Sequence, residues 1–223
     1  IHFFNPVAQM PLVEVIRGER SRDTEVDKGC AFVTGIGKFP LVAKSVPGFL
    51  VNRVLAPYMM SALARVDKGE DMQKIDEAAR MFGMPMGPVE LADTVGLDVC
   101  LHVGKILGLG SEGQGGRLER LVNSGRLGKK TGEGFYVWKD GKAEKKLETY
   151  ADGELERLGR ELAQPLIDEA QKALDQNVVA NADLVDAGVI FGTGFAPFRG
   201  GPLHYRDSHG GPGAGSHERV AAE

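Results

Sequence analysis

The first 46 residues alternate between short apolar runs and one amphipathic segment. Residues 12 to 16 and 39 to 43 are apolar apart from Glu14, and such nearly continuous runs are typical of buried strands in a parallel sheet. Between them, Asp23 or Thr24 can cap a helix that glycines end near residue 36. This order predicts the last part of a doubly wound α/β (Rossmann) domain, over residues 1–46.

From residue 48 onward the pattern changes to the helical period. Apolar side chains recur every four residues at Leu50, Val54, Tyr58, Ala62 and Val66. They predict one long helix that ends near Gly69 and bends at Pro57, because proline removes a helical hydrogen bond. Further helices are predicted over residues 72–82 and 88–107.

The second half of the chain repeats this helical order. The paired positions are Pro57 and Pro165, Asp76 and Asp186, and Gly87-Pro88 and Gly201-Pro202. Such self-similarity indicates a duplicated module whose two copies bury their apolar faces against each other. The predicted fold is therefore mainly α, with the α/β remnant at 1–46 and two tandem helical modules at 47–148 and 149–223. No fold is predicted for the glycine-rich end from residue 210 onward.

Composition narrows the function classes. The chain has 223 residues and a net charge of −4, which argues against a dedicated nucleic-acid surface. Its two cysteines, Cys30 and Cys100, lie in apolar contexts and do not indicate a disulfide scaffold. No run of the sequence is apolar enough to span a bilayer, and no metal site is predicted. Association with a membrane surface stays open.

The candidate chemistry begins with His2 and Glu14. A carboxylate inside a buried strand is unfavourable without a partner, and a histidine is a suitable one. A carboxylate behind a histidine orients the imidazole and makes it more basic. The alternative is that Glu14 points to solvent from an edge strand, and spacing alone leaves both readings open.

Five motifs carry a resemblance to the 3-hydroxyacyl-CoA dehydrogenase family. They are His2-Phe3-Phe4-Asn5-Pro6 with Met10-Pro11-Leu12-Val13-Glu14-Val15-Ile16, Ser45-Val46-Pro47-Gly48-Phe49-Leu50-Val51-Asn52-Arg53, Pro85-Met86-Gly87-Pro88, Asp93-Thr94-Val95-Gly96-Leu97-Asp98 and Gly128-Lys129-Lys130-Thr131-Gly132-Glu133-Gly134-Phe135-Tyr136. They cover most of residues 1–138 in family order.

The resemblance implies a role for each candidate residue. His2 is expected to act as the catalytic base, with Glu14 orienting its ring and Asn52 binding the substrate carbonyl. Asn5 is expected to shape a turn, with direct substrate contact as the weaker alternative. NAD is the implied cofactor, and its glycine-rich loop is expected upstream of Ile1, so no cofactor-binding residue is assigned here.

The duplicated helical module resembles the multifunctional fatty-acid β-oxidation proteins, which also carry enoyl-CoA hydratase activity. The expected substrate is an acyl-CoA, and a thiolase subunit or a second copy of the chain are possible partners. One alternative is a 3-hydroxybutyryl-CoA dehydrogenase of butanoate metabolism, and another is a non-catalytic helical module that docks a thiolase. We expect a cytoplasmic location in a bacterium, or a mitochondrial or peroxisomal one in a eukaryote.

Overall fold

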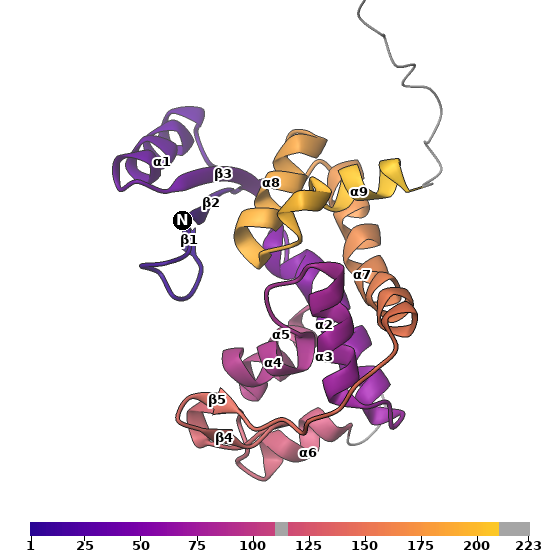
Figure 1. Ribbon diagram of the computed structural model, residues 1–223. Helices are drawn as coiled ribbons and strands as arrows, with labels where there is room; N and C mark the ends of the chain where they lie inside the picture. The colour runs from indigo at the N-terminus through magenta and orange to yellow at the C-terminus, as the bar shows by residue number, and fades with distance from the viewer. Residues whose placement is uncertain (110–115, 210–223) are drawn as a thin grey trace, which may run out of the picture.

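The computed structural model describes residues 1–109 and 116–209. The N-terminal part is a small α/β unit (Figure 1). β1 (His2–Phe3) pairs antiparallel with β2 (Leu12–Arg17), and β2 pairs parallel with β3 (Phe39–Lys44). The helix α1 (Asp23–Gly35) joins β2 to β3, so the predicted strand–helix–strand order is confirmed. The end from residue 210, for which no fold is predicted, lies outside the described residues.

The two faces of β2 serve two different cores, because successive side chains of a strand point in opposite directions. Val13 and Val15 pack against α1 in a small core of their own. Leu12, together with Leu41 of β3, belongs to the main core that the helices build. Glu14 shares the face of Leu12 and therefore points toward the helices.

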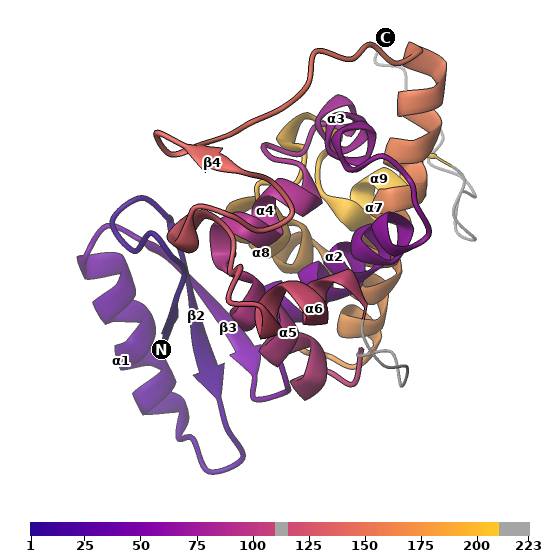
Figure 2. The same cartoon turned by 90° about the horizontal axis from the view of Figure 1, so that it is seen from below.

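The rest of the described chain is mostly helical (Figures 1 and 2). Its helices are α2 (Val51–Asp67), α3 (Met72–Phe82), α4 (Pro88–Val95), α5 (Leu97–Ile106), α6 (Arg117–Asn123), α7 (Asp152–Asp175), α8 (Ala182–Thr193) and α9 (Pro202–Ser208). Two short 3-10 turns, η1 (Lys129–Thr131) and η2 (Pro197–Arg199), and a hairpin of β4 (Trp138–Lys139) and β5 (Lys142–Ala143) complete the fold.

Two local predictions are wrong. The single helix predicted over residues 88–107 is broken into α4 and α5 at Gly96, whose φ of 108° lies outside the helical region. Neither Asp23 nor Thr24 caps α1. The cap position is Arg22, which makes no side-chain capping bond, and the Asp23 carboxylate pairs with Arg17 instead.

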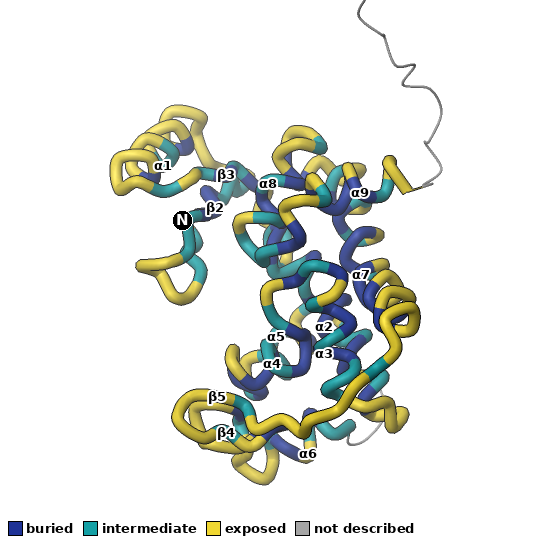
Figure 3. The backbone as a smooth tube through the Cα atoms, in the orientation of Figure 1, coloured by how far each residue is buried: buried dark blue, intermediate teal, exposed yellow. Residues whose placement is uncertain are grey.

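The predicted apolar stripe of α2 is buried. Leu50, Val54, Tyr58 and Met59 are at most 8 % exposed. Most of the tube of α2 has the colours of buried and intermediate residues (Figure 3). The long helix α7 packs along α2 and α3 and covers much of this stripe. Among residues 1–109 and 116–209, no helix combines the length and the apolar composition needed to cross a membrane.

Candidate active site

The centre of the site is the buried carboxylate of Glu14. It lies on the central strand β2 and is fully buried, so the alternative of a solvent-facing edge position is wrong. His2 on β1 stands directly opposite in the antiparallel register, and its Nδ1 lies 2.9 Å from Glu14 Oε2. The predicted contact between the two side chains is thus present, and strand pairing positions both partners.

The other oxygen of Glu14 binds the start of α2. Oε1 accepts hydrogen bonds from the backbone N–H groups of Leu50, at 3.0 Å, and Val51, at 3.1 Å. These N–H groups have no partner within the helix, and the helix dipole favours a negative charge there. Three hydrogen bonds therefore compensate the burial of the carboxylate and tie the sheet to α2.

A tight turn brings α2 this close to the strand. A Cβ atom at Gly48 would lie 2.9 Å from the backbone nitrogen of Arg53, closer than real Cβ atoms come to such an atom. Phe49 follows with a φ of 50°, a conformation uncommon for residues other than glycine. The turn thus fixes both the first turn of α2 and the Phe49 ring.

The His2 ring lies between two aromatic rings but remains reachable. Its centroid is 4.7 Å from that of Phe4 and 5.3 Å from that of Phe49. The side chain is 31 % exposed, and no bond from Nε2 to another described residue is present. With Glu14 ionised, Nδ1 must donate, because a carboxylate can only accept, and Nε2 then carries the lone pair. The arrangement is that of a base whose reactive nitrogen faces an open side.

Asn52 lies in the first turn of α2, immediately after the two residues that bind Glu14. It is half-buried and forms one end of an apolar groove between α2 and the α4–α5 pair. Asn5 is exposed and precedes Pro6 across a cis peptide bond in a turn closed by a hydrogen bond from Gln9 N to Pro6 O. Asn5 thus lies just before the turn of residues 6–9, and both its shaping role and a direct substrate contact stay predictions.

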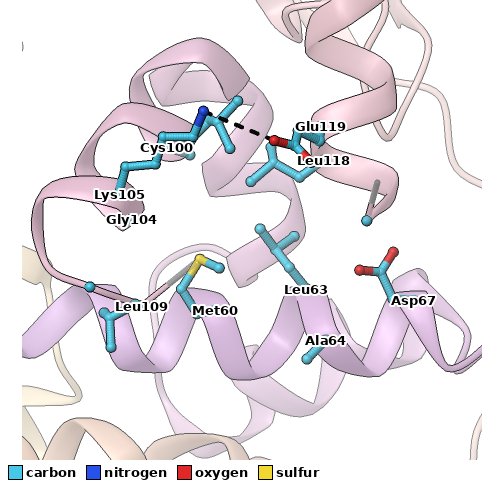
Figure 4. A pocket seen from close by; sticks show the side chains of 13 residues that line it. Met60, Leu63, Ala64, Asp67, Cys100, Gly104, Lys105, Leu109, Leu118 and Glu119 are labelled. Atoms are coloured by element: carbon cyan, nitrogen blue, oxygen red, sulfur yellow. Dashed lines mark ion pairs between the residues drawn. The ribbon is translucent and has the colours of Figure 1, made fainter. Parts of the chain in front are cut away.

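Of the hollows that adjoin α2 in the described part of the chain, two share lining residues with each other. The groove that starts at Asn52 has a volume of about 160 Å³. A larger hollow of about 600 Å³ lies between α2, α5 and α6, where Met60 and Leu63 of α2 point toward α5 and α6 (Figure 4). Cys100 lines both hollows, and burial, followed by the charges of Asp93 and Asp98, raises the pKa of its thiol to about 12, so it stays neutral.

Three further buried carboxylates have no predicted role. Asp76 accepts from the N–H groups of Val89 and Glu90 in α4, and Asp186 accepts from Leu203 and His204 in α9. The third, Asp93, binds the backbone N–H groups of residues 135 and 136 and the Trp138 indole, each at 2.9 Å. The sequence signal for the first two was the aspartate that precedes each Gly-Pro pair. These carboxylates hold helix starts and loops in place.

Asp76 makes stability depend on pH. Burial raises its pKa to about 6, although the Tyr136 hydroxyl and Val89 N–H donate to it and Lys145 and Arg80 lie near. The folded chain then binds this proton more tightly than the unfolded chain. The contribution, up to about 3 kcal/mol, is therefore complete only below the unfolded pKa of 3.8 and is lost as the pH rises through about 6.

We expect the Asp76→Asn variant to lack this contribution. Urea unfolding of both proteins, measured from about pH 4.5 to 7, gives the difference between their unfolding free energies. This difference should decrease as the pH rises and approach a constant value as the pH reaches about 7. The exposed Asp27→Asn serves as control and should follow the wild type. A difference between Asp76→Asn and wild type that stays constant across this range would contradict the prediction.

Comparisons with known proteins agree with the motifs. Residues 1–46 match the model of the "3-hydroxyacyl-CoA dehydrogenase, NAD binding domain", and residues 48–138 match that of the "3-hydroxyacyl-CoA dehydrogenase, C-terminal domain". A fatty acid oxidation complex subunit alpha from Idiomarina loihiensis is 37 % identical over 94 % of this chain and 32 % of its own length. The chain therefore spans about a third of the length of the curated relatives it matches.

Solved structures of dehydrogenases also match most of this chain. The 3-hydroxybutyryl-CoA dehydrogenase from Escherichia coli matches with a TM-score of 0.76 and 26 % identity, over 94 % of this chain and 63 % of that one. The dehydrogenase part of multifunctional enzyme 1 from C. elegans matches with a TM-score of 0.59 and 25 % identity, over 86 % of this chain and 47 % of that one.

Proposed function

Because the chain belongs to the 3-hydroxyacyl-CoA dehydrogenase family, we propose that it supplies the catalytic base and the substrate-binding helices for NAD-dependent oxidation of L-3-hydroxyacyl-CoA to 3-oxoacyl-CoA in fatty-acid β-oxidation. The observation that carries the proposal is the chain of contacts from His2 through Glu14 to the start of α2. It orients one imidazole, and it ends at Val51, the residue before Asn52.

Oxidation of a secondary alcohol to a ketone removes a proton and a hydride. His2 Nε2 takes the proton from the 3-hydroxyl group, since the free lone pair of a neutral imidazole nitrogen can act as a general base. Glu14 holds the tautomer that makes Nε2 the acceptor and stabilises the imidazolium that forms. Asn52 donates from its carboxamide to the oxygen that becomes the carbonyl and orients the substrate.

The family match implies NAD as the hydride acceptor. The pyrophosphate of a dinucleotide is normally held by a glycine-rich turn between a strand and a helix. Among the described residues, the turn from β2 into α1 contains a single glycine, Gly18, and does not fit this role. The residues of this chain therefore act on the substrate side of the reaction.

The domain organisation belongs to the same proposal. We divide the chain into the α/β remnant at 1–46 and two copies of one helical module at 47–148 and 149–223. The support is the matched role of Asp76 and Asp186, each of which binds the two N–H groups that follow a Gly-Pro pair. Pro57 and Pro165 also lie inside corresponding long helices, α2 and α7.

A second candidate function is that of a 3-hydroxybutyryl-CoA dehydrogenase. It is favoured by the Escherichia coli structure, which matches 94 % of this chain, including the C-terminal helices. The two candidates differ in acyl chain length. We also propose docking of a thiolase, association of two copies and a bacterial cytoplasmic location; the bacterial source of the relatives named fatty acid oxidation complex subunit alpha agrees with a bacterial origin.

The test is a chimera. This chain replaces the aligned third of the Idiomarina loihiensis subunit, to which it is 37 % identical. We expect NADH formation, followed by its absorbance, from both L-3-hydroxybutyryl-CoA and L-3-hydroxydecanoyl-CoA. The same subunit without the segment serves as the negative control.

The outcomes separate the candidates. Activity on the four-carbon substrate alone would support the butyryl enzyme. A folded chimera that forms no NADH from either substrate would contradict both and favour a non-catalytic module.

A further inference from the structure

The helix α8 packs directly on the surroundings of Glu14, and we propose that it positions the pair of His2 and Glu14 for proton transfer. Gly188 and Gly192 are the positioning residues, because they allow α8 to come this close. The inference rests on the proposed function, since it gives the second half of the chain a role in the same reaction. The match to the C-terminal domain model ends at residue 138, before α8 begins.

Gly192 lies against Val51 and Leu12. An added Cβ atom there would lie 2.6 Å from Val51 Cγ2, a distance at which the two groups overlap, and 3.2 Å from Leu12 Cδ2. Val51 donates its N–H to Glu14 Oε1, and Leu12 lies two positions before Glu14 on the same face of β2. Gly192 therefore adjoins one residue that binds the carboxylate and one that lies beside it.

Gly188, one helical turn earlier, lies against Leu50 and Leu41. An added Cβ atom would lie 2.8 Å from Leu50 Cδ2 and 2.7 Å from Leu41 Cδ2. Leu50 donates its N–H to the same oxygen of Glu14, and Leu41 is the residue of β3 that pairs with Glu14 in the parallel register. The side chains nearest to both glycines thus belong to residues adjacent to Glu14 in the strand, the sheet or the hydrogen-bond pattern.

These contacts give α8 two effects on the carboxylate. Glycine is unfavourable inside a helix, but it lets the helix backbone approach another element closely. Through this approach α8 presses the start of α2 onto the sheet and covers the leucine and valine side chains around Glu14, all of which are buried. It thereby helps to keep water from the carboxylate and keeps the two N–H donors within hydrogen-bond distance.

Contacts near both ends of β3 hold α8 in this place. Phe191 of α8 stacks on Phe39 at the beginning of the strand, with ring centroids 5.0 Å apart. At the other end, the N–H of Lys44 donates to the carbonyl oxygen of Val178, shortly before α8, at 2.8 Å. Because α8 is held on the sheet in this way, a side chain added on its inner face would push on the start of α2.

The position of α2 matters because the two oxygens of Glu14 belong to one rigid carboxylate. The donors at Oε1 fix its plane, and this plane directs Oε2 at His2 Nδ1. Displacement of the start of α2 would lengthen the bonds to Oε1 and allow the carboxylate to rotate. The imidazole would then lose the partner that keeps its proton on Nδ1 and its lone pair on Nε2.

The first test measures turnover in the chimeric enzyme. Gly192→Ala should lower kcat at least about tenfold and leave KM within about threefold, because the new methyl group displaces Val51 and with it a donor to Glu14. Val51→Ala removes the two methyl groups that the new Cβ atom would meet and keeps the N–H. The double variant should therefore come within about threefold of Val51→Ala alone.

Gly188→Ala is the second variant, for the case in which Gly192→Ala does not fold. Its added methyl group meets the ends of two leucine side chains, which can rotate away. We expect it to fold and to lower kcat about threefold, with KM unchanged.

The second test observes His2 itself. NMR of isotope-labelled histidine in the 223-residue chain, at about pH 8.5, reports the tautomer of a neutral imidazole, and His2→Gln identifies the His2 signals. The wild type should carry the proton on Nδ1, whereas Gly192→Ala should show a mixture that includes the Nε2–H tautomer. This signal does not depend on activity, so it reports positioning alone.

Gly159→Ala is the matched control. Its added Cβ atom would also overlap, at 2.5 Å from the carbonyl oxygen of Ala78, but it does so between α7 and α3. The variant should lower the melting temperature and leave the His2 tautomer and the kcat of the folded enzyme unchanged.

Three results would overturn the proposal. They are an unchanged His2 tautomer in a folded Gly192→Ala chain, a Gly159→Ala enzyme that loses as much kcat as Gly192→Ala, and a double variant with Val51→Ala that is as slow as Gly192→Ala. The proposed function is tested separately by NADH formation in the unmodified chimera. If that activity is absent while the His2 tautomer follows Gly192, the positioning by α8 stands and the proposed chemistry is wrong.

Discussion

Replacing His2 with glutamine in the chimeric enzyme should lower kcat by about 10³- to 10⁴-fold, because the proton of the 3-hydroxyl group then has no acceptor. Glu14→Gln should lower kcat by about 10²- to 10⁴-fold through a different route. The amide oxygen can still accept from Leu50 and Val51, but the amide nitrogen donates to His2 Nδ1. His2 then carries its proton on Nε2 and cannot accept another there.

The readout separates a positioning role from a structural one. KM for the acyl-CoA should change by less than about threefold in both variants, since Glu14 does not touch the ligand and His2 contributes a single hydrogen bond to its binding. The melting temperature of Glu14→Gln should stay close to that of wild type. His102→Gln on the exposed side of α5 serves as the control and should retain full activity. A Glu14→Gln enzyme that keeps more than about a tenth of kcat would show that the tautomer of His2 is not held by Glu14.

The contact between His2 and Glu14 could be predicted because a carboxylate within an apolar strand demands a partner. What the pattern could not decide was whether β2 lies at an edge of the sheet. β2 is a central strand because β1 (His2–Phe3) pairs with one of its edges and β3 with the other. A strand of two residues is too short to show an alternation of apolar and polar residues in the sequence. The resemblance to the family, and not the spacing, supplied the missing information.

The groove could not be predicted at all. Its walls come from α2 and from the α4–α5 pair, and the periodicity of each helix reports only that it has an apolar side. The break at Gly96 was missed because apolar residues continue across it, and it is the break that allows α5 to leave the direction of α4. Whether Val95 and Val99 are covered depends on where neighbouring helices end, which is a property of the tertiary structure.

The duplication was predicted from paired residues, and it leads to the last prediction. Gly87 and Gly201 each pack directly on the aspartate that binds the following helix start, Asp76 and Asp186 respectively. A Cβ atom at either glycine would overlap the side chain of that aspartate. Gly201 also has a φ of 109°, which disfavours any residue with a side chain. Gly87→Ala and Gly201→Ala should therefore each lower the free energy of unfolding by about 3 kcal/mol or more.

Urea unfolding followed by circular dichroism measures both effects. Gly153→Ala, in the exposed first turn of α7, meets no atom within 4 Å and is the matched control, with an expected gain of about 0.5–1 kcal/mol. If the two halves are copies of one module packed on each other, both alanine variants should shift a single transition, because α7 packs along α2 and α3. The opposite outcome would be a large loss of unfolding free energy in Gly87→Ala and no loss in Gly201→Ala. It would mean that Asp186 does not stabilise the start of α9 as Asp76 stabilises the start of α4, and that the second module does not repeat the packing of the first.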